Sequence, residues 1–355
     1  MTALHVTFYS YKGGVGRTLA LLNVAVVLAE AGFRVVAIDL DLEAPGFGLS
    51  ELTRRADPRA FLGFSDLVID RVSNYLERPV ERFAYPILRE RCGERLWLFP
   101  AGLRAQSLVR ELPSFYGPVV NVSGIFLNVL AEIVDKMEPH FVLIDSRTGL
   151  ADIAAIPTIE LSEVLVAVSG LSEQNIRGMA SVLELFRTHE NRPVYGEGEH
   201  EGEEVPQLQL VVLSPLPERI VVDGRAFSLD QTMEQLAAAP GLRTSLPSVD
   251  PLVARVVLAQ ELLLTPAVAY HAELRQKGAY GRISREDVLH HLSLEPEVPV
   301  LGELQLDRAG SRLPGQYRRL ARALARAHPD VVVPPSLDAL PGVALTPWFV
   351  EVADG

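Results

Sequence analysis

Cysteine is nearly absent from this chain: Cys92 is the single one among 355 residues. One thiol cannot form an intrachain disulfide, and it argues against a metal site built from the cysteines of one chain. Long apolar runs are lacking as well, since there is no 18-residue hydrophobic span and no basic leader before the first apolar segment. We therefore expect a soluble, cytoplasmic protein without a membrane span.

Positive charge is also scarce. Lysine and arginine number 33 against 45 acidic residues, so the formal net charge is −12. Such a balance argues against nucleic acid or anionic lipid covering the whole surface, although it leaves room for a local basic patch. Residues 308–326 hold six arginines and no acid. We expect them to form the last helix of a domain, with its leucine face packed on a sheet, rather than a DNA or lipid contact.

Apolar residues, in contrast, make up 48% of the chain, which is ample for one large α/β domain or two ordinary ones. Short apolar runs alternate with longer helical patterns, which is typical of a doubly wound, mainly parallel sheet with helices on both faces. The expected strands are 5–9, 35–38, 96–99, 141–144, 164–168, 208–213 and 298–301, and helices are expected at 19–31, 125–137 and 174–188.

A glycine-rich segment separates the first expected strand from the first expected helix. Residues 10–18 read Ser-Tyr-Lys-Gly-Gly-Val-Gly-Arg-Thr. Glycines at 13, 14 and 16 allow successive backbone N–H groups to point at one anion, and the following helix adds its positive dipole end. The strand–loop–helix context favours a phosphate-binding loop over a glycine-rich turn that binds nothing.

Chemistry beyond anion binding needs a metal ion and a group that orients water. Thr18 is placed to offer its hydroxyl to Mg²⁺, and Arg17 to reach the β- and γ-phosphates of a nucleotide. The second strand ends at Asp39, followed by Asp41, and the fourth ends at Asp145. The carboxyl ends of parallel strands line one crevice, so these carboxylates should meet the loop.

These motifs together resemble the deviant Walker A ATPases of the ParA/MinD class. The resemblance rests on Tyr-Lys-Gly-Gly-Val-Gly-Arg-Thr at 11–18, Asp-Leu-Asp at 39–41 and Ile-Asp-Ser-Arg-Thr-Gly at 144–149. Segments 63–67 and 298–304 are similar to further motifs of that class. The resemblance covers residues 1–214 and 298–328, and it implies a P-loop NTPase fold, binding of ATP and Mg²⁺, and a homodimer formed around the nucleotide.

The resemblance also implies roles for individual residues. Lys12 matches the signature lysine that reaches the phosphates of the partner subunit, and Asp41 matches the carboxylate that orients the attacking water. These two are the expected catalytic residues, while Thr18, Asp39 and Asp145 are expected to support Mg²⁺. The expected nucleotide-binding residues are Gly13, Gly14, Val15, Gly16, Arg17, Thr18, Leu19, Ser214 and Pro215.

Arg17 departs from the ParA/MinD pattern, which usually has lysine at this position. A planar guanidinium can grip two phosphate oxygens, but it is bulkier than an ammonium group. We therefore expect nucleotide binding with slow hydrolysis. Ser214 also departs from the pattern, which commonly has asparagine where the adenine base is contacted.

Residues 215–297 depart from the alternating strand–helix pattern. Helical patterns occur at 229–238, 251–264, 266–276 and 285–292, and no strand is evident. We expect residues 1–214 and 298–355 to form the ATPase domain, and 215–297 a helical insertion that serves as a lid or docks a partner.

Two functions remain open on these observations. The first is a Mg-ATPase that dimerises around ATP and acts as a switch for an unidentified protein partner. The alternative is a nucleotide-sensing regulatory or adaptor module with little turnover, in a bacterial signalling or defence system. A phosphotransferase resembling bacterial tyrosine kinases is disfavoured, because the last tyrosine is Tyr317 and no tyrosine-rich tail follows it.

Overall fold

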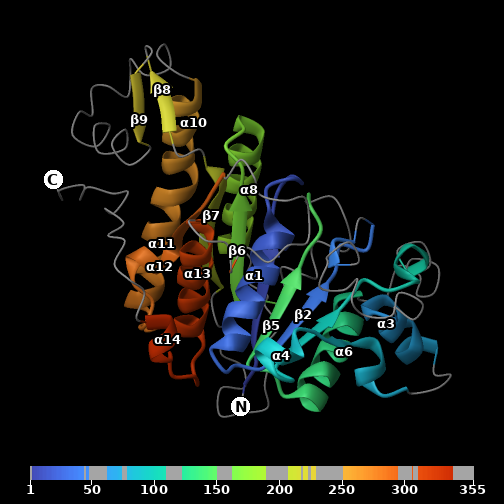
Figure 1. The fold of residues 1–355 in the computed structure, drawn as a ribbon. Coiled ribbons are helices and arrows are strands. Elements are labelled where there is room, and N and C mark those ends of the chain that lie inside the picture. The colour runs from blue at the N-terminus through green and yellow to red at the C-terminus, as the bar shows by residue number, and fades with distance from the viewer. Residues whose placement is uncertain are drawn as a thin grey trace.

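A central sheet with helices on both faces organises the molecule (Figure 1). The computed structural model describes residues 2–43, 45–47, 62–73, 78–108, 122–149, 162–188, 207–216, 219–222, 225–228, 251–294, 306 and 311–338. Within these ranges the sheet has eight strands in the order β10-β7-β6-β1-β5-β2-β4-β3, and all neighbours pair in parallel except β3 and β4. The strands are β1 (Leu4–Tyr9), β2 (Val35–Asp39), β3 (Tyr85–Pro86), β4 (Leu96–Phe99), β5 (Phe141–Asp145), β6 (Val164–Ser169), β7 (Leu208–Leu216) and β10 (Leu289–Ser293). A separate antiparallel pair is formed by β8 (Arg219–Val222) and β9 (Arg225–Ser228).

Both faces of the sheet are apolar, because side chains alternate along each strand. On β2, Val35 and Ala37 belong to one buried cluster, while Val36 and Ile38 belong to another. The first cluster includes α1 (Arg17–Glu30), α8 (Glu173–Thr188) and α13 (Leu313–Ala327), and the second includes α3 (Phe64–Ser73) and α6 (Val122–Met137). Further helices in the described residues are α4 (Arg89–Cys92), α10 (Pro251–Ala259), α11 (Thr265–Gln276), α12 (Arg285–Val288) and α14 (Pro335–Asp338), with a 3₁₀ turn at Val80–Phe83 and a π-helical segment at Gln260–Leu264.

The topology places one crevice at the carboxyl end of β1. Strand β1 lies between β5 and β6, and the chain continues from β1 to β2 on one side and from β5 to β6 on the other. Ligands in open parallel sheets bind where the strand order reverses in this way. The glycine-rich segment follows β1 directly and so lies at this point.

The expected fold class is confirmed, and so are the six strands and three helices that were expected in the described part of residues 1–214, with end shifts of a few residues. The expected helix 285–292 is wrong in its second half. Residues 285–288 form α12, but 289–293 form β10, which pairs in parallel with β7. The expected strand 298–301 and helix 229–238 lie outside the described residues.

The error has a physical cause in the neighbouring sequence. Ser284 and Asp287 form a reciprocal cap that starts a helix at Arg285, a local signal that hides how short the helix is. The next residues, Leu-His-His-Leu-Ser, have weak strand propensity of their own and are held by the edge of β7. Residues 215–297 are therefore not wholly helical, and the division of the chain into two domains stays a prediction.

Among the described residues, no helix is long and apolar enough to cross a membrane.

Candidate nucleotide-binding site

The loop after β1 has the backbone of an anion-binding turn. Gly14 and Gly16 have φ angles of +79° and +81°, a region that disfavours side chains, and Gly16 is the N-cap of α1. Helix α1 begins at Arg17, so its unpaired N–H groups and positive dipole end face the loop. The backbone at Gly14, Gly16 and Arg17 therefore has the turn and helix start that a phosphate-binding loop needs, while anion binding at residues 13–18 stays a prediction.

Arg17 does not extend into solvent but lies buried, with 7% of its surface exposed. Its Nε donates to Asp145 Oδ1 at 2.5 Å, its Nη2 to Asp41 Oδ2 at 3.2 Å, and its Nη1 to Ser10 Oγ at 3.5 Å. Burial lowers the pKa of Arg17, but the two carboxylates outweigh this and raise it above its usual value. One cation therefore compensates two of the carboxylates that the sequence placed at the site.

Thr18 and the predicted metal carboxylates lie around the same point. Thr18 Oγ1 donates to Asp145 Oδ2 at 2.6 Å, and Asp39 is the partner of Asp145 in the β2–β5 register. Asp39 accepts the N–H groups of Asp41 and Phe47 at 3.1 and 3.0 Å. Burial, followed by the nearby Asp145 carboxylate, raises the pKa of Asp39 to about 8. Burial likewise raises the pKa of Asp145 against the opposing effect of Arg17.

This donor set fits part of a magnesium shell. Mg²⁺ prefers oxygen ligands and is usually bound through one or two carboxylates, water and substrate phosphates. Thr18 and Asp145 offer a hydroxyl and a carboxylate side by side. Within the described residues, however, no three acidic, histidine or cysteine side chains are arranged to hold a metal ion by themselves. The remaining ligands would have to come from a bound nucleotide and water.

Lys12 lies apart from this buried cluster. Its side chain is exposed, and its Nζ donates to Gln174 Oε1 at the start of α8. The neighbouring Tyr11 packs its ring against Gly178 of α8, so closely that a Cβ there would lie 2.2 Å from Tyr11 Cε1. The loop is thus anchored on α8 while the ammonium group of Lys12 faces outward, and its catalytic role stays a prediction.

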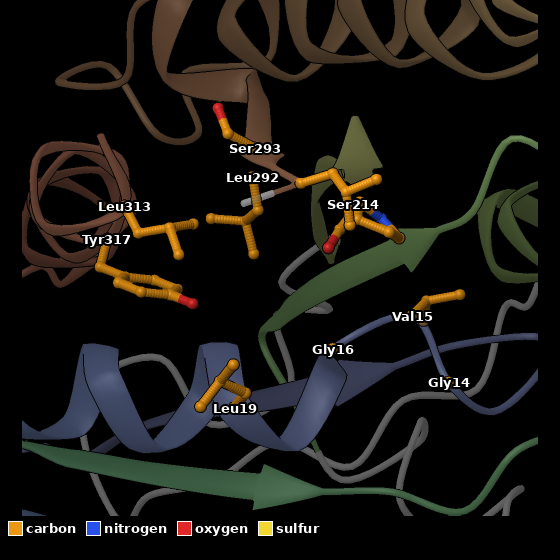
Figure 2. A pocket seen from close by; sticks show the side chains of 11 residues that line it. Gly14, Val15, Gly16, Leu19, Ser214, Leu292, Ser293, Leu313 and Tyr317 are labelled. Atoms are coloured by element: carbon orange, nitrogen blue, oxygen red, sulfur yellow. The ribbon is translucent and has the colours of Figure 1, made fainter. Parts of the chain in front are cut away.

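A pocket opens beside the loop, between α1, β10 and α13 (Figure 2). Its walls combine predicted residues with others from the far end of the chain, and it is lined by Gly14, Val15, Gly16, Leu19, Ser214, Pro215, Leu292, Ser293, Leu294, Leu313 and Tyr317. Most of these are apolar, which suits a flat aromatic base, and Ser214 adds a hydroxyl close to Gly16. The structure thus brings the predicted residues Val15, Leu19, Ser214 and Pro215 to one place.

The β10 and α13 wall was missed by sequence reasoning. A buried glutamine holds it together: Ser293 N donates to Gln316 Oε1 at 2.9 Å, and Gln316 Nε2 donates to Ser293 Oγ at 2.8 Å. Tyr317, the next residue, is 1% exposed and lines the pocket. The one available signal was the helical repeat of Leu313, Tyr317 and Leu320, which shows a buried face but not what it covers.

Comparisons with known proteins agree with this geometry. The family model described as the CobQ/CobB/MinD/ParA nucleotide binding domain matches residues 6–318. The chain is 22% identical over 234 residues to the septum site-determining protein MinD of Helicobacter pylori, covering 66% of this chain and 75% of that one. It is 25% identical over 180 residues to a putative MinD of Oltmannsiellopsis viridis, covering 51% and 49% of the two chains.

A solved structure shares the fold across nearly the whole chain. This is a putative plasmid partition protein of Borrelia burgdorferi bound to AMPPNP, with a TM-score of 0.53 and 11% identity over 91% of this chain and 98% of that one. The family match spans most of the chain and includes the loop, the carboxylates and the pocket wall up to Tyr317. The chain therefore belongs to the CobQ/CobB/MinD/ParA nucleotide-binding family and has the fold of the ParA/MinD-type P-loop ATPases.

Proposed function

We propose that this protein binds Mg-ATP at the loop of residues 13–18, dimerises around the nucleotide, and uses slow hydrolysis as a switch for a protein partner. The observation that carries the proposal is the convergence of Arg17, Thr18, Asp41 and Asp145 at the carboxyl ends of β1, β2 and β5, beside an apolar pocket. An adenine nucleotide is favoured because the Borrelia burgdorferi protein of the same fold holds AMPPNP.

In this proposal each element of the site has one task. The N–H groups of the glycine loop hold the phosphates, and the pocket between α1, β10 and α13 takes the base. Thr18 and Asp145 hold Mg²⁺, which neutralises charge on the phosphates when it is bound. Asp41 accepts a hydrogen bond from the attacking water, and Lys12 stabilises the developing charge from across a dimer interface.

The same geometry also supports the second function, a nucleotide sensor with little turnover. Asp41 is the residue proposed to orient water, but its Oδ2 accepts a hydrogen bond from Arg17. A carboxylate held by a guanidinium is a weaker acceptor for a water proton than a free one. Hydrolysis would then be too slow to act as a timer, and nucleotide binding alone would carry the signal.

Light scattering during size-exclusion chromatography, run with ATP, ADP or no nucleotide, separates the two functions when phosphate release is measured in parallel. The switch predicts an ATP-dependent dimer of the wild type. It also predicts that Asp41→Ala traps this dimer and that Lys12→Ala abolishes phosphate release. A wild type that binds ATP but stays monomeric and releases no phosphate would establish the sensor. Failure to bind any nucleotide would refute both.

A further inference from the structure

The side chain of Arg17 contacts two carboxylates of the candidate site, one of which is proposed to hold Mg²⁺. We propose that Arg17 is a positioning residue that takes the place of the metal ion in the nucleotide-free protein, holding Asp145 and Asp41 until a nucleotide draws its guanidinium away. Arg17 and Mg²⁺ are then alternative cations for the same carboxylate. The part of the proposal that concerns release by nucleotide rests on the proposed function, whereas the part that concerns competition with Mg²⁺ does not.

The contacts of Arg17 direct three of its five N–H groups away from the loop and toward other side chains. Its Nε, Nη2 and Nη1 point to Asp145, Asp41 and Ser10, and its side chain is 8% exposed. The glycine loop, in contrast, is open, with Gly13 and Gly14 exposed. To turn its fork toward an anion held by the loop, this buried guanidinium would have to weaken its hold on the two carboxylates.

Both carboxylate oxygens of Asp145 also accept hydrogen bonds. Its Oδ1 accepts from Arg17 Nε at 2.5 Å and its Oδ2 accepts from Thr18 Oγ1 at 2.6 Å, while its side chain is fully buried. A magnesium ion that used Thr18 and Asp145 would have to share the Asp145 carboxylate with Arg17 or displace it. It would also enter a site where the positive charge of Arg17 lies within hydrogen-bond distance of the ligand.

Whether Mg²⁺ can enter the site depends on whether Arg17 is there to balance the charge of the buried carboxylates. Asp39, Asp41 and Asp145 are three buried acidic groups, and Arg17 donates to Asp41 and to the fully buried Asp145. Removing this buried cation leaves the Asp145 carboxylate uncompensated, which destabilises the fold unless another cation replaces it. The protein without Arg17 should therefore acquire an affinity for Mg²⁺ that the wild type lacks when no nucleotide is present.

The test is thermal unfolding in a MgCl₂ series without nucleotide, with NaCl controls of equal ionic strength. The wild type is expected to show no specific shift up to about 10 mM Mg²⁺, because a ligand raises the midpoint only by binding the folded state. Arg17→Gln is expected to melt lower than the wild type and to regain several degrees with Mg²⁺. Arg17→Lys keeps the charge and should respond like the wild type, and Arg17→Gln/Asp145→Asn should lose the Mg²⁺ response.

Two outcomes overturn the inference: an Arg17→Gln midpoint that ignores Mg²⁺, or a wild type that responds to Mg²⁺ as strongly as the variant. If Arg17→Gln does not fold, Mn²⁺ binding to the wild type, measured by electron paramagnetic resonance, decides the question. Competition predicts no bound Mn²⁺ in the absence of nucleotide, and tight binding without it refutes the proposal. A wild type that binds no nucleotide at all would refute the proposed function, while the Mg²⁺ response of Arg17→Gln would still be tested.

Discussion

At the residue scale, having arginine and not lysine at position 17 of the phosphate loop changes how charge is arranged in the whole site. A lysine would present one compact charge, whereas the fork of Arg17 reaches two carboxylates from different strands. The expectation of slow turnover therefore gains a physical cause: Arg17 donates to Asp41, the residue proposed to orient water. The turnover itself stays a prediction until phosphate release is measured.

The glycines of the loop have unequal tolerance for a side chain. Gly16 has φ +81°, and a Cβ there would lie 3.4 Å from Ser214 Oγ, whereas Gly13 has no atom within 4 Å of its Cβ position. We expect Gly16→Ala to lower the free energy of unfolding by about 1 kcal/mol through backbone strain, and Gly13→Ala to leave it unchanged. Chemical denaturation of the two nucleotide-free variants checks this. Equal stability of both would contradict the assigned loop geometry.

At the element scale, the pocket wall depends on how β10 is tied to α13. Gln316→Ala removes both hydrogen bonds to Ser293 and leaves the buried N–H of Ser293 without its partner. Leaving such a group unpaired costs about 1–3 kcal/mol, and the shifted wall should weaken nucleotide binding as well. Titration with a fluorescent ATP analogue, together with denaturation, measures both effects.

Arg318→Ala is the matched control for Gln316→Ala, because Arg318 is on the same helix but does not line the pocket. It should leave the affinity for the analogue unchanged. An equal loss of affinity in both variants would mean that α13 acts through general stability and not through the wall that contains Ser293.

The two histidines of β10 should make the folded protein less stable in mild acid. Burial lowers the pKa of both His290 and His291 to about 4. Asp287 opposes this at His290, and nearby arginines including Arg319 add to it at both residues. The unfolded chain takes up protons near pH 6.5, so it binds more protons than the folded protein between pH 6.5 and 4. Stability should therefore fall as the pH is lowered through this window, by about 1–2 kcal/mol per histidine at pH 5.

Urea denaturation at pH 7 and pH 5 measures this effect. The double variant His290→Gln/His291→Gln carries no titrating group at these positions, so its midpoint should change less between the two pH values than that of the wild type. An equal change in both proteins would show that other groups cause the acid sensitivity.

Some strands and helices can be predicted from the sequence, and others cannot. Strands β1, β2, β5 and β6 are buried on both faces, so their apolar runs stand out, and the glycines and Asp145 have fixed places at the ends of such strands. Strand β10 has no such run and forms because β7 offers it an edge. The contact of α13 with α1 joins residues about 300 positions apart, and no local pattern specifies it. The pairing of Arg17 with Asp41 depends in the same way on how far two strand ends lie from each other.

At the scale of the whole molecule, net charge should oppose the proposed dimer. Each chain carries a formal charge of −12, so two copies repel each other at low ionic strength. Salt screens this repulsion over about 10 Å at 0.1 M. With saturating nucleotide, we expect the dimer fraction measured by light scattering to rise between 50 and 300 mM NaCl. A fall would mean that attraction between the Lys12 ammonium group and the phosphates dominates the interface.

Helix α1 is enclosed on two sides, by the sheet and by α13, and is buried from Ala20 to Ala29. Such a helix cannot slide or roll without opening two close-packed interfaces. We expect this helix to keep its place when nucleotide binds. Spin labels at the exposed Glu30 of α1 and at the half-buried Arg318 of α13 should therefore keep their separation when nucleotide is added, while a label at Glu43 should change its distance to either helix.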